Sequence, residues 1–260
     1  MRISSAVAVR PERSRQAEIA ALWAEGSRDL RGAWPPEQTI GSVSHCPPNK
    51  TARRTAPGTS VRWPAASGLK RLIDVLGAGF GLVFLAPFLL LVALTIRLES
   101  PGPALFRQRR TGRGGVPFVI YKFRTMRCLE DGPHITQASR GDRRTTRLGA
   151  LLRRSSIDEL PQLINVLKGD MSLVGPRPHA LAHDQLYAAA IDNYEARFLA
   201  RPGISGLAQV SGLRGATPSV ECMAARVALD LEYIQRWSII LDVRILVQTL
   251  LMGPFDPAAF

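Results

Sequence analysis

The stretch at residues 75–96, VLGAGFGLVFLAPFLLLVALTI, decides the architecture of this chain, because these 22 consecutive residues include no charged side chain. A straight helix of that length measures about 33 Å, enough to cross the roughly 30 Å hydrocarbon core of a bilayer. A buried helix of a soluble domain is the alternative, but a run with no polar face argues against it. The segment therefore predicts a membrane helix.

Two features of this segment favour a re-entrant helix over a straight span. Pro87 lies near its middle, where proline removes a backbone hydrogen bond and kinks a helix. Both flanks are basic, with Lys70 and Arg71 before the run and Arg97 after it. Positive residues favour the cytoplasmic side, so both ends are expected there. A straight span remains open, because membrane helices tolerate proline.

The rest of the chain is organised around this segment. Residues 1–68 hold seven of the 19 prolines and no sustained apolar period, which predicts a mostly disordered tail. Residues 69–98 form the predicted re-entrant helix, and residues 99–260 a cytoplasmic, membrane-associated domain. The cysteines at 46, 128 and 222 are scattered, so we expect neither a disulfide framework nor a CxxC metal pair.

The pattern of residues 99–260 predicts an α/β domain, in detail α+β and mostly helical with a small β-hairpin. Residues 103–108 and 117–126 are rich in β-formers and flank a Gly-rich turn. Helices are expected at 144–154, 158–168, 180–199 and 220–251, the last of these being two helices that meet near Trp237. The predicted architecture is a proline-broken membrane helix plus a catalytic domain on the membrane surface.

The charge of the chain indicates an anionic partner. There are 34 Lys and Arg against 21 Asp and Glu, a formal net charge of +13. Thirteen basic and three acidic residues fall between Arg107 and Arg154, directly after the membrane segment. Anionic inner-membrane lipids and a phosphate-rich substrate both explain this excess. Nucleic acid is not expected as a partner, because no recognised nucleic-acid-binding motif is present.

Two adjacent carboxylates, Asp158 and Glu159, follow this basic stretch. One interpretation is helix capping, since Ser156-x-x-Glu159 matches a capping box and Pro161 suits a first helical turn. The functional interpretation is catalysis. A helix N-terminus and nearby arginines keep a carboxylate ionised and attract phosphate. An ionised Asp158 can then attack phosphorus, while Glu159 can hold the Mg²⁺ that accompanies a diphosphate.

Several basic residues are candidates for holding phosphate. Arg177, Arg201 and Arg214 each occupy a stiff loop containing Pro or Gly, a setting that favours a binding role over free solvation. Lys122 and Arg124 lie on the predicted hairpin. His179 and His183 have a metal-ligand spacing, but no third ligand accompanies them, so we do not expect a metal there.

These residues lie in an ordered set of motifs that covers residues 69–252 and resembles the bacterial sugar transferase family, monotopic phosphoglycosyl transferases that initiate polysaccharide assembly. The motifs are KRLID at 70–74, SPGP at 100–103, YKFRTM at 121–126, DELPQ at 158–162, KGDMS at 168–172, VGPRP at 174–178 and RPGISGLAQ at 201–209. Arg153 and Arg177 match arginines that the family places near the substrate phosphates.

The resemblance implies a re-entrant membrane helix, an active-site domain on the cytoplasmic face of the inner membrane, Mg²⁺, and a ping-pong reaction. Asp158 would attack the β-phosphorus of a UDP-sugar, so that UMP leaves and a phosphosugar remains on the carboxylate. Undecaprenyl phosphate would then accept the sugar phosphate. Glu159 corresponds to the Mg²⁺ ligand.

Within the family, the motifs PHA at 178–180, GLRG at 212–215 and DLEYI at 230–234 resemble those of glucose-1-phosphate transferases of exopolysaccharide synthesis. Glucose 1-phosphate is therefore the expected group, with galactose or an N-acetylated sugar as alternatives. A membrane-anchored basic scaffold without catalysis is a further alternative. Such a scaffold has no need of the Asp158–Glu159 pair together with three arginine loops.

Overall fold

The computed structural model describes residues 67–127, 142–215, 217 and 219–252. The predicted disordered tail lies almost wholly outside these residues, as do Cys46 and Cys128. Within the described part, the chain is mostly helical, with two small sheets and one long apolar helix. To that extent the predicted fold class is confirmed.

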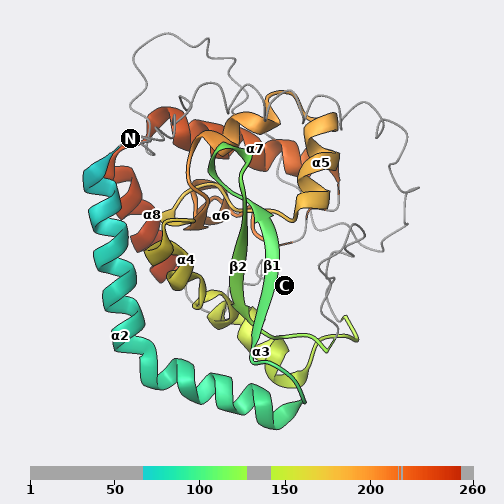
Figure 1. Cartoon of the computed structure of the whole chain (residues 1–260). Coiled ribbons are helices and arrows are strands. Elements are labelled where there is room, and N and C mark those ends of the chain that lie inside the picture. Colours follow the sequence, from blue (N-terminus) through green and yellow to red (C-terminus); the bar gives the residue numbers. More distant parts are fainter. Residues whose placement is uncertain (1–66, 128–141, 216, 218, 253–260) are drawn as a thin grey trace, which may run out of the picture. The chain divides into compact units, whose positions relative to one another are not determined.

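The apolar run forms the long helix α2, Gly68–Glu99 (Figure 1). The side chain of Ser67 caps its start by accepting a hydrogen bond from the amide of Lys70. Pro87 lies inside the helix, and Figure 1 shows α2 bending partway along its length. Proline removes one helical hydrogen bond and its ring clashes with the preceding turn, so a bend in this helix follows from the sequence.

Much of the surface of α2 is apolar and uncovered. Phe80 is 72% exposed, Val83 78% and Leu98 76%. Among the described residues, α2 alone is long and apolar enough to cross a membrane. An apolar surface of this size is unfavourable in water, so it indicates that the protein associates with a membrane.

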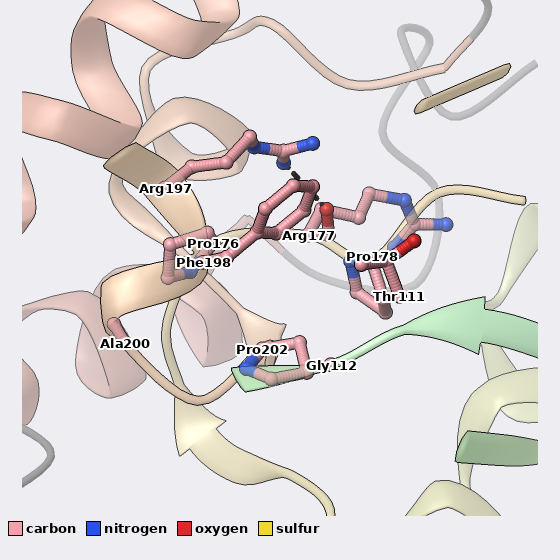
Figure 2. Close-up of a pocket in the computed structure, with 9 residues that line it drawn as sticks. All are labelled: Thr111, Gly112, Pro176, Arg177, Pro178, Arg197, Phe198, Ala200 and Pro202. Carbon is pink, nitrogen blue, oxygen red and sulfur yellow. Dashed lines mark hydrogen bonds between the residues drawn. The ribbon is translucent and has the colours of Figure 1, made fainter. Parts of the chain in front are cut away.

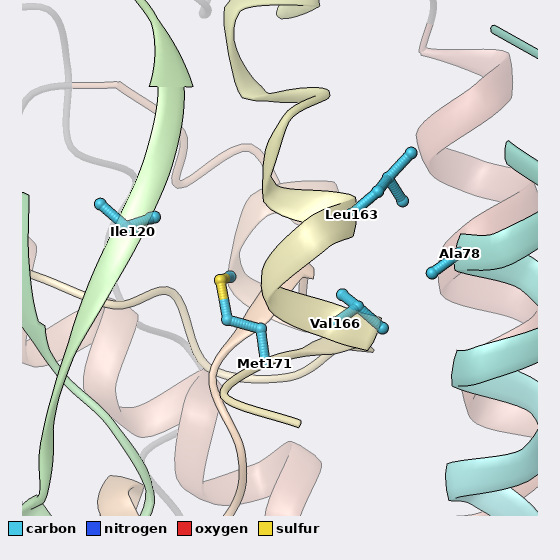
Figure 3. Packing of buried hydrophobic residues seen from close by; sticks show 5 residues of the cluster. All are labelled: Ala78, Ile120, Leu163, Val166 and Met171. Atoms are coloured by element: carbon cyan, nitrogen blue, oxygen red, sulfur yellow. The ribbon is translucent and has the colours of Figure 1, made fainter. Parts of the chain in front are cut away.

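The other side of α2 packs on the rest of the domain. Figure 3 shows Ala78 of α2 facing Leu163 and Val166 of helix α4, Gln162–Lys168. Ile120 and Met171 belong to the same buried cluster. Burial of each larger side chain contributes about 1.5–3 kcal/mol, so this cluster holds the membrane helix against the element that follows the carboxylate pair.

The predicted β-hairpin is present. Strand β1, Leu105–Thr111, pairs antiparallel with β2, Pro117–Phe123, and Gln108 lies opposite Ile120. A short 3₁₀ turn, η2, Arg113–Gly115, connects them. The first strand extends three residues beyond the predicted end, and the second stops three residues before its predicted end.

Helix α3, Arg147–Arg154, confirms the prediction for this region, with Thr146 as its N-cap. The helix predicted for residues 158–168 is shorter than expected. A 3₁₀ turn, η3, Ile157–Glu159, comes first, and α4 begins only after Pro161. The Asp-Glu pair therefore lies on a separate turn ahead of α4.

The structure also contains a second, parallel sheet of two strands, which the sequence did not predict. Strands β3, Ser172–Val174, and β4, Gly203–Ser205, are only three residues each, too short for a recognisable alternation. Their approach depends on glycine: a Cβ on Gly203 or Gly175 would overlap the backbone of the facing segment. The close contact between these two strands fixes the start of the loop that follows β3.

The C-terminal helices follow the predicted order. Helix α5, Leu181–Ala190, and the 3₁₀ helix η4, Tyr194–Leu199, replace the single helix expected at 180–199. A short helix, α6, Leu207–Val210, follows β4. Helices α7, Val220–Arg236, and α8, Ile239–Leu251, meet at Trp237 as predicted.

The carboxylate of Asp242 on α8 connects these helices to α2. It accepts hydrogen bonds from Lys70 Nζ at 2.7 Å, Tyr233 Oη at 2.8 Å and Trp237 Nε1 at 3.1 Å. The Lys70–Asp242 ion pair is buried, so it fixes the start of the membrane helix against the C-terminal helices.

Candidate active site

The carboxylate pair occupies a tight turn between α3 and α4. Ser156, immediately before it, has φ 57° and ψ 16°, a left-handed conformation that a residue other than glycine seldom adopts. The Ser156 hydroxyl accepts a hydrogen bond from Nη2 of Arg214. Strained backbone of this kind clusters at functional sites, where the surrounding structure holds it in place.

The capping interpretation of this segment is wrong. The side chain of Ser156 makes no capping hydrogen bond, and only its carbonyl accepts from the amide of Glu159. Both oxygens of Glu159 bind cationic side chains instead. Electrostatic attraction to two nearby cations outweighs the weaker gain from a capping box.

Glu159 is the most heavily bonded residue of the pair. Its Oε1 accepts from Lys122 Nζ at 2.6 Å and from Arg177 Nη2 at 2.6 Å, while Oε2 accepts from Arg177 Nη1 at 3.1 Å. Burial alone would raise the pKa of Glu159, but the charges of Arg177 and Lys122 outweigh it and hold this pKa well below its usual range. Glu159 is therefore ionised at neutral pH.

Asp158, its neighbour, is in the opposite electrostatic state. The side chain is buried, with 8% of the residue exposed. Burial raises the pKa of Asp158 to about 6, and the negative charge of Glu159 adds to this, although Lys122, Arg153 and Arg177 oppose it. At neutral pH the carboxylate is still mainly ionised but poorly compensated. That combination suits a nucleophile, which needs a charge not already used in a strong hydrogen bond.

The position of Lys122 is set by contacts between β2 and α4. Asn165 of α4 accepts from the amide of Tyr121 at 3.0 Å and donates to the carbonyl of Val119 at 2.6 Å. These two bonds hold β2 beside the start of α4, so that Lys122 reaches Glu159. Burial lowers the pKa of Lys122, while the charge of Glu159 opposes the change.

The structure brings six of the eight predicted site residues to one place. Glu159, Lys122 and Arg177 are in direct contact. Arg153, at the end of α3, is close enough for its charge to lower the pKa of Asp158. Arg214 reaches the same turn through Ser156. Cations from these segments thus outnumber the two carboxylates, an arrangement whose charge suits a phosphate group.

The remaining two predicted residues contact main-chain carbonyls. Arg124 is buried and donates to the carbonyls of Ile96, Ser100 and Pro101, at the end of α2. Arg201 donates to the carbonyl of Gly169. Arg124 therefore has a main-chain anchoring role here, while phosphate binding by Arg201 stays a prediction. Helix ends and turns leave carbonyls without partners, and a guanidinium can satisfy several of them.

Arg177 lies in the loop after β3, between Pro176 and Pro178. A small pocket opens beside it, and Figure 2 shows this pocket together with Arg197 of η4 and Thr111 at the end of β1. Arg197 donates from Nη2 to the carbonyl of Arg177 at 2.6 Å. Arg197 is buried, but no motif in the sequence distinguishes it from the many exposed arginines.

The described residues contain no group of three or more His, Cys, Asp and Glu side chains placed to hold a metal ion. Glu159 has the hard oxygen ligands that Mg²⁺ prefers, but Lys122 and Arg177 occupy both of them. His179 is buried and contacts Nη1 of Arg197 through Nδ1 at 2.6 Å. The residues thus fit a divalent cation only if these side chains release Glu159 and other oxygens contribute.

Fold and site together define a membrane-associated enzyme that acts on an anionic, phosphate-bearing substrate. The model of the family described as bacterial sugar transferase matches residues 65–254. The chain therefore belongs to the bacterial sugar transferase family and is a transferase.

Relatives with assigned names agree with this classification. Over 193 residues, the chain is 59% identical to a UDP-glucose:undecaprenyl-phosphate glucose-1-phosphate transferase of Caulobacter vibrioides, covering 74% of this chain and 72% of that protein. Over 192 residues it is 47% identical to the protein of the same name in Escherichia coli, covering 74% of this chain and 41% of that one. An Aeromonas hydrophila protein named as an N-acetylgalactosaminephosphotransferase is 42% identical over 74% of this chain and 45% of its own length.

Proposed function

We propose that this protein transfers a sugar 1-phosphate, glucose 1-phosphate first, from a UDP-sugar to undecaprenyl phosphate and thereby initiates exopolysaccharide assembly. The observation that carries the proposal is the contrast within the pair: Asp158 is buried and poorly compensated, while Glu159 beside it is fully paired. The relatives named for UDP-glucose and undecaprenyl phosphate support the choice of substrates.

The chain's own residues supply the first half of the reaction. An oxygen of the ionised Asp158 carboxylate attacks the β-phosphorus of the UDP-sugar, and the bond from that phosphorus to the bridging oxygen breaks. UMP leaves with the bonding electrons, and the sugar phosphate remains as an acyl phosphate on Asp158. Lys122, Arg153 and Arg177 stabilise the negative charge on the phosphate oxygens.

The second half regenerates the carboxylate. An oxygen of undecaprenyl phosphate attacks the same phosphorus, and the bond to the Asp158 oxygen breaks. Undecaprenyl diphosphate sugar leaves, and Asp158 is again ionised. No net proton is required if the acceptor phosphate enters fully ionised.

Glu159 has two successive roles in this scheme. Without substrate it binds Lys122 and Arg177. The oxygens of a bound diphosphate would compete for both cations, and the Glu159 carboxylate would then be the residue that holds Mg²⁺. Bound Mg²⁺ would neutralise charge on the diphosphate, which is the usual contribution of this ion.

The membrane arrangement proposed here follows from α2. Both of its ends carry basic residues, Lys70 and Arg71 at one and Arg97 at the other. Pro87 interrupts its helical hydrogen bonds. We therefore infer that α2 enters and leaves the inner membrane on the cytoplasmic side, where UDP-sugars are available.

Cysteine labelling tests this arrangement. Single cysteines next to Lys70 and Arg97, in a background without Cys46, Cys128 and Cys222, are probed in spheroplasts with a membrane-impermeant thiol reagent. We expect protection of both positions, and labelling of both after lysis. Labelling of one position alone in intact spheroplasts would establish a straight span.

The reaction is tested with purified protein in lipid nanodiscs. Given UDP-glucose without lipid acceptor, it should release about one UMP per active site and gain the mass of a hexose phosphate. UDP-galactose and UDP-N-acetylgalactosamine, run in parallel, decide the sugar, and the Aeromonas relative makes the N-acetylated substrate a specific alternative. Absence of UMP release with every UDP-sugar and undecaprenyl phosphate would overturn the proposed function.

A further inference from the structure

A second buried charged cluster lies on the main-chain side of Arg177. Its centre is Arg197 of η4, which is only 2% exposed. Nη2 of Arg197 donates to the carbonyl of Arg177 at 2.6 Å and to Oδ2 of Asp230 at 2.8 Å. Figure 2 shows the guanidinium of Arg197 directed at the main chain of the Arg177 loop.

Nη1 of the same guanidinium also contacts buried polar groups. Nη1 of Arg197 donates to Tyr194 Oη at 2.9 Å and contacts His179 Nδ1 at 2.6 Å. Asp184 lies 3.6 Å away and accepts a hydrogen bond from Tyr194. Burial, together with the charge of Arg197, lowers the pKa of His179 to about 3. A neutral imidazole has one acceptor nitrogen, which here is Nδ1, because a guanidinium only donates.

The Arg177 loop is also held at Pro178, whose carbonyl accepts a hydrogen bond from Nη1 of Arg110 at 3.3 Å. Pro176 and Pro178 flank Arg177, and neither has an amide hydrogen that could anchor the segment. Pro176 contributes its carbonyl to Gly203, which fixes the loop on one side. The contact from Arg197 fixes the next peptide unit, the one that carries the side chain of Arg177.

The direction of that peptide unit matters because the Arg177 side chain binds Glu159 with both nitrogens, at 2.6 and 3.1 Å. A two-point contact is sensitive to rotation of the backbone from which it extends. Rotation of the carbonyl would move the guanidinium away from the carboxylate pair.

We propose that Arg197, held by Asp230, is a positioning residue that sets the main chain of Arg177 and so directs the Arg177 guanidinium into the active site. The inference rests on the proposed function, and it assigns a role to a residue outside the substrate-binding set. Arg197 touches no reacting atom, so its effect passes entirely through Arg177.

A double-mutant cycle tests this inference. The variants are Arg197→Lys, Arg177→Lys and the two combined, each assayed for the kcat/KM of UMP release and for thermal unfolding. Lysine at 197 keeps the charge but has one terminal nitrogen, so it cannot reproduce the Nη1 contacts together with the Nη2 bonds to the carbonyl and Asp230. Arg197→Lys alone is expected to lower kcat/KM by about 10- to 100-fold, in the range seen for residues that orient functional groups. In the Arg177→Lys background, Arg197→Lys should lower kcat/KM by less than about threefold, because the guanidinium that Arg197 positions is already absent.

Two further variants separate positioning from folding. Tyr194→Phe removes the hydroxyl that contacts Nη1 but leaves the bond to the Arg177 carbonyl, so it should lower the unfolding temperature without changing kcat/KM. Asp230→Asn weakens the bond to Nη2 of Arg197. If Arg197→Lys does not fold, Asp230→Asn takes its place and should show the same loss of kcat/KM. Equal losses of kcat/KM in both Arg177 backgrounds would overturn the inference and leave a structural role only. An inactive wild type would overturn the proposed function instead, so the two failures are distinguishable.

Discussion

Arg177 belongs to two buried charged clusters that differ in how they titrate. Its guanidinium lies in the carboxylate cluster with Glu159, and its carbonyl lies in the cluster centred on Arg197. In the carboxylate cluster, burial raises the pKa of Asp158 to about 6, close to physiological pH. In the Arg197 cluster, burial lowers the pKa of His179 to about 3, so that this group stays neutral.

The difference separates the cluster that supplies the reactive group from the cluster that holds Arg177 in place. In the Arg197 cluster, His179 stays neutral over the working pH range, which suits a group that holds other residues in place. In the carboxylate cluster, the charge of Asp158 is buried, which disfavours its ionised form. A cost in stability at a site of this kind is typical of catalytic groups, which are selected for reactivity rather than for stability.

The largest expected effect comes from Asp158→Asn. The amide has nearly the same shape but cannot form the acyl phosphate, so UMP release should fall by about 10⁶-fold, as for other nucleophile deletions. The same change removes a buried charge, and the shift of its pKa from 3.8 to about 6 corresponds to a gain of about 2–3 kcal/mol in unfolding free energy at pH 7. Burst kinetics and denaturant unfolding measure the two effects. Full activity, with deamidation excluded by mass spectrometry, would contradict the role of Asp158.

Glu159→Gln is the corresponding carboxylate-to-amide change at the neighbouring residue. In contrast to Asp158→Asn, it should lower the free energy of unfolding. It leaves Lys122 buried without its carboxylate, which costs about 3 kcal/mol in comparable buried pairs. Activity should fall by about 10²-fold, because the charge that orders the cations is lost. Thermal unfolding of both variants at pH 7 decides the comparison. Stabilisation by Glu159→Gln would show that its ion pairs are not net favourable.

The sequence predicted the elements that depend on composition and local pattern. The charge-free run at 75–96 predicted α2, and the Gly-rich turn predicted the hairpin. At Trp237 the helix is interrupted, and the side chain of Ser238 caps the start of α8 by accepting from the amide of Leu241. Each of these signals is contained within a short window, so no knowledge of distant contacts was needed.

The predictions that failed depended on distant contacts. The capping box was wrong because Lys122 and Arg177, far from Glu159 in sequence, compete for its carboxylate. Arg124 was assigned to phosphate because nothing local shows that carbonyls of residues 96–101 lie beside it. The strands β3 and β4 are too short to show alternation, and Arg197 is recognisable only through its contact with Arg177.

Two arginines with the same predicted role, phosphate binding, sharpen the comparison further. Arg153→Lys should lower kcat/KM by about 10- to 100-fold with little effect on stability, because a forked donor near Asp158 is replaced by a point charge. Arg124→Lys should do the reverse: it loses bonds to main-chain carbonyls at the end of α2 and lowers the unfolding temperature, with kcat/KM within about threefold. Parallel kinetics and melting curves test the pair. Near-normal kinetics for Arg153→Lys would place Arg153 outside the site.

The smallest expected effect is the pH dependence, and it separates activity from stability. Asp158 attacks only when ionised, so kcat/KM should fall about tenfold per pH unit below a pKa of about 6. The folded-state pKa of this carboxyl lies above its unfolded value of 3.8, so protonation favours the folded state. Wild type should therefore gain stability relative to Asp158→Asn as the pH falls from 7 to 5, while it loses activity. Glu159 and His179 do not interfere in this window, because the pKa values of both are lowered below it. A rate that stays constant down to pH 5, or parallel loss of stability in both proteins, would show that the acid limb reports unfolding rather than protonation of the nucleophile.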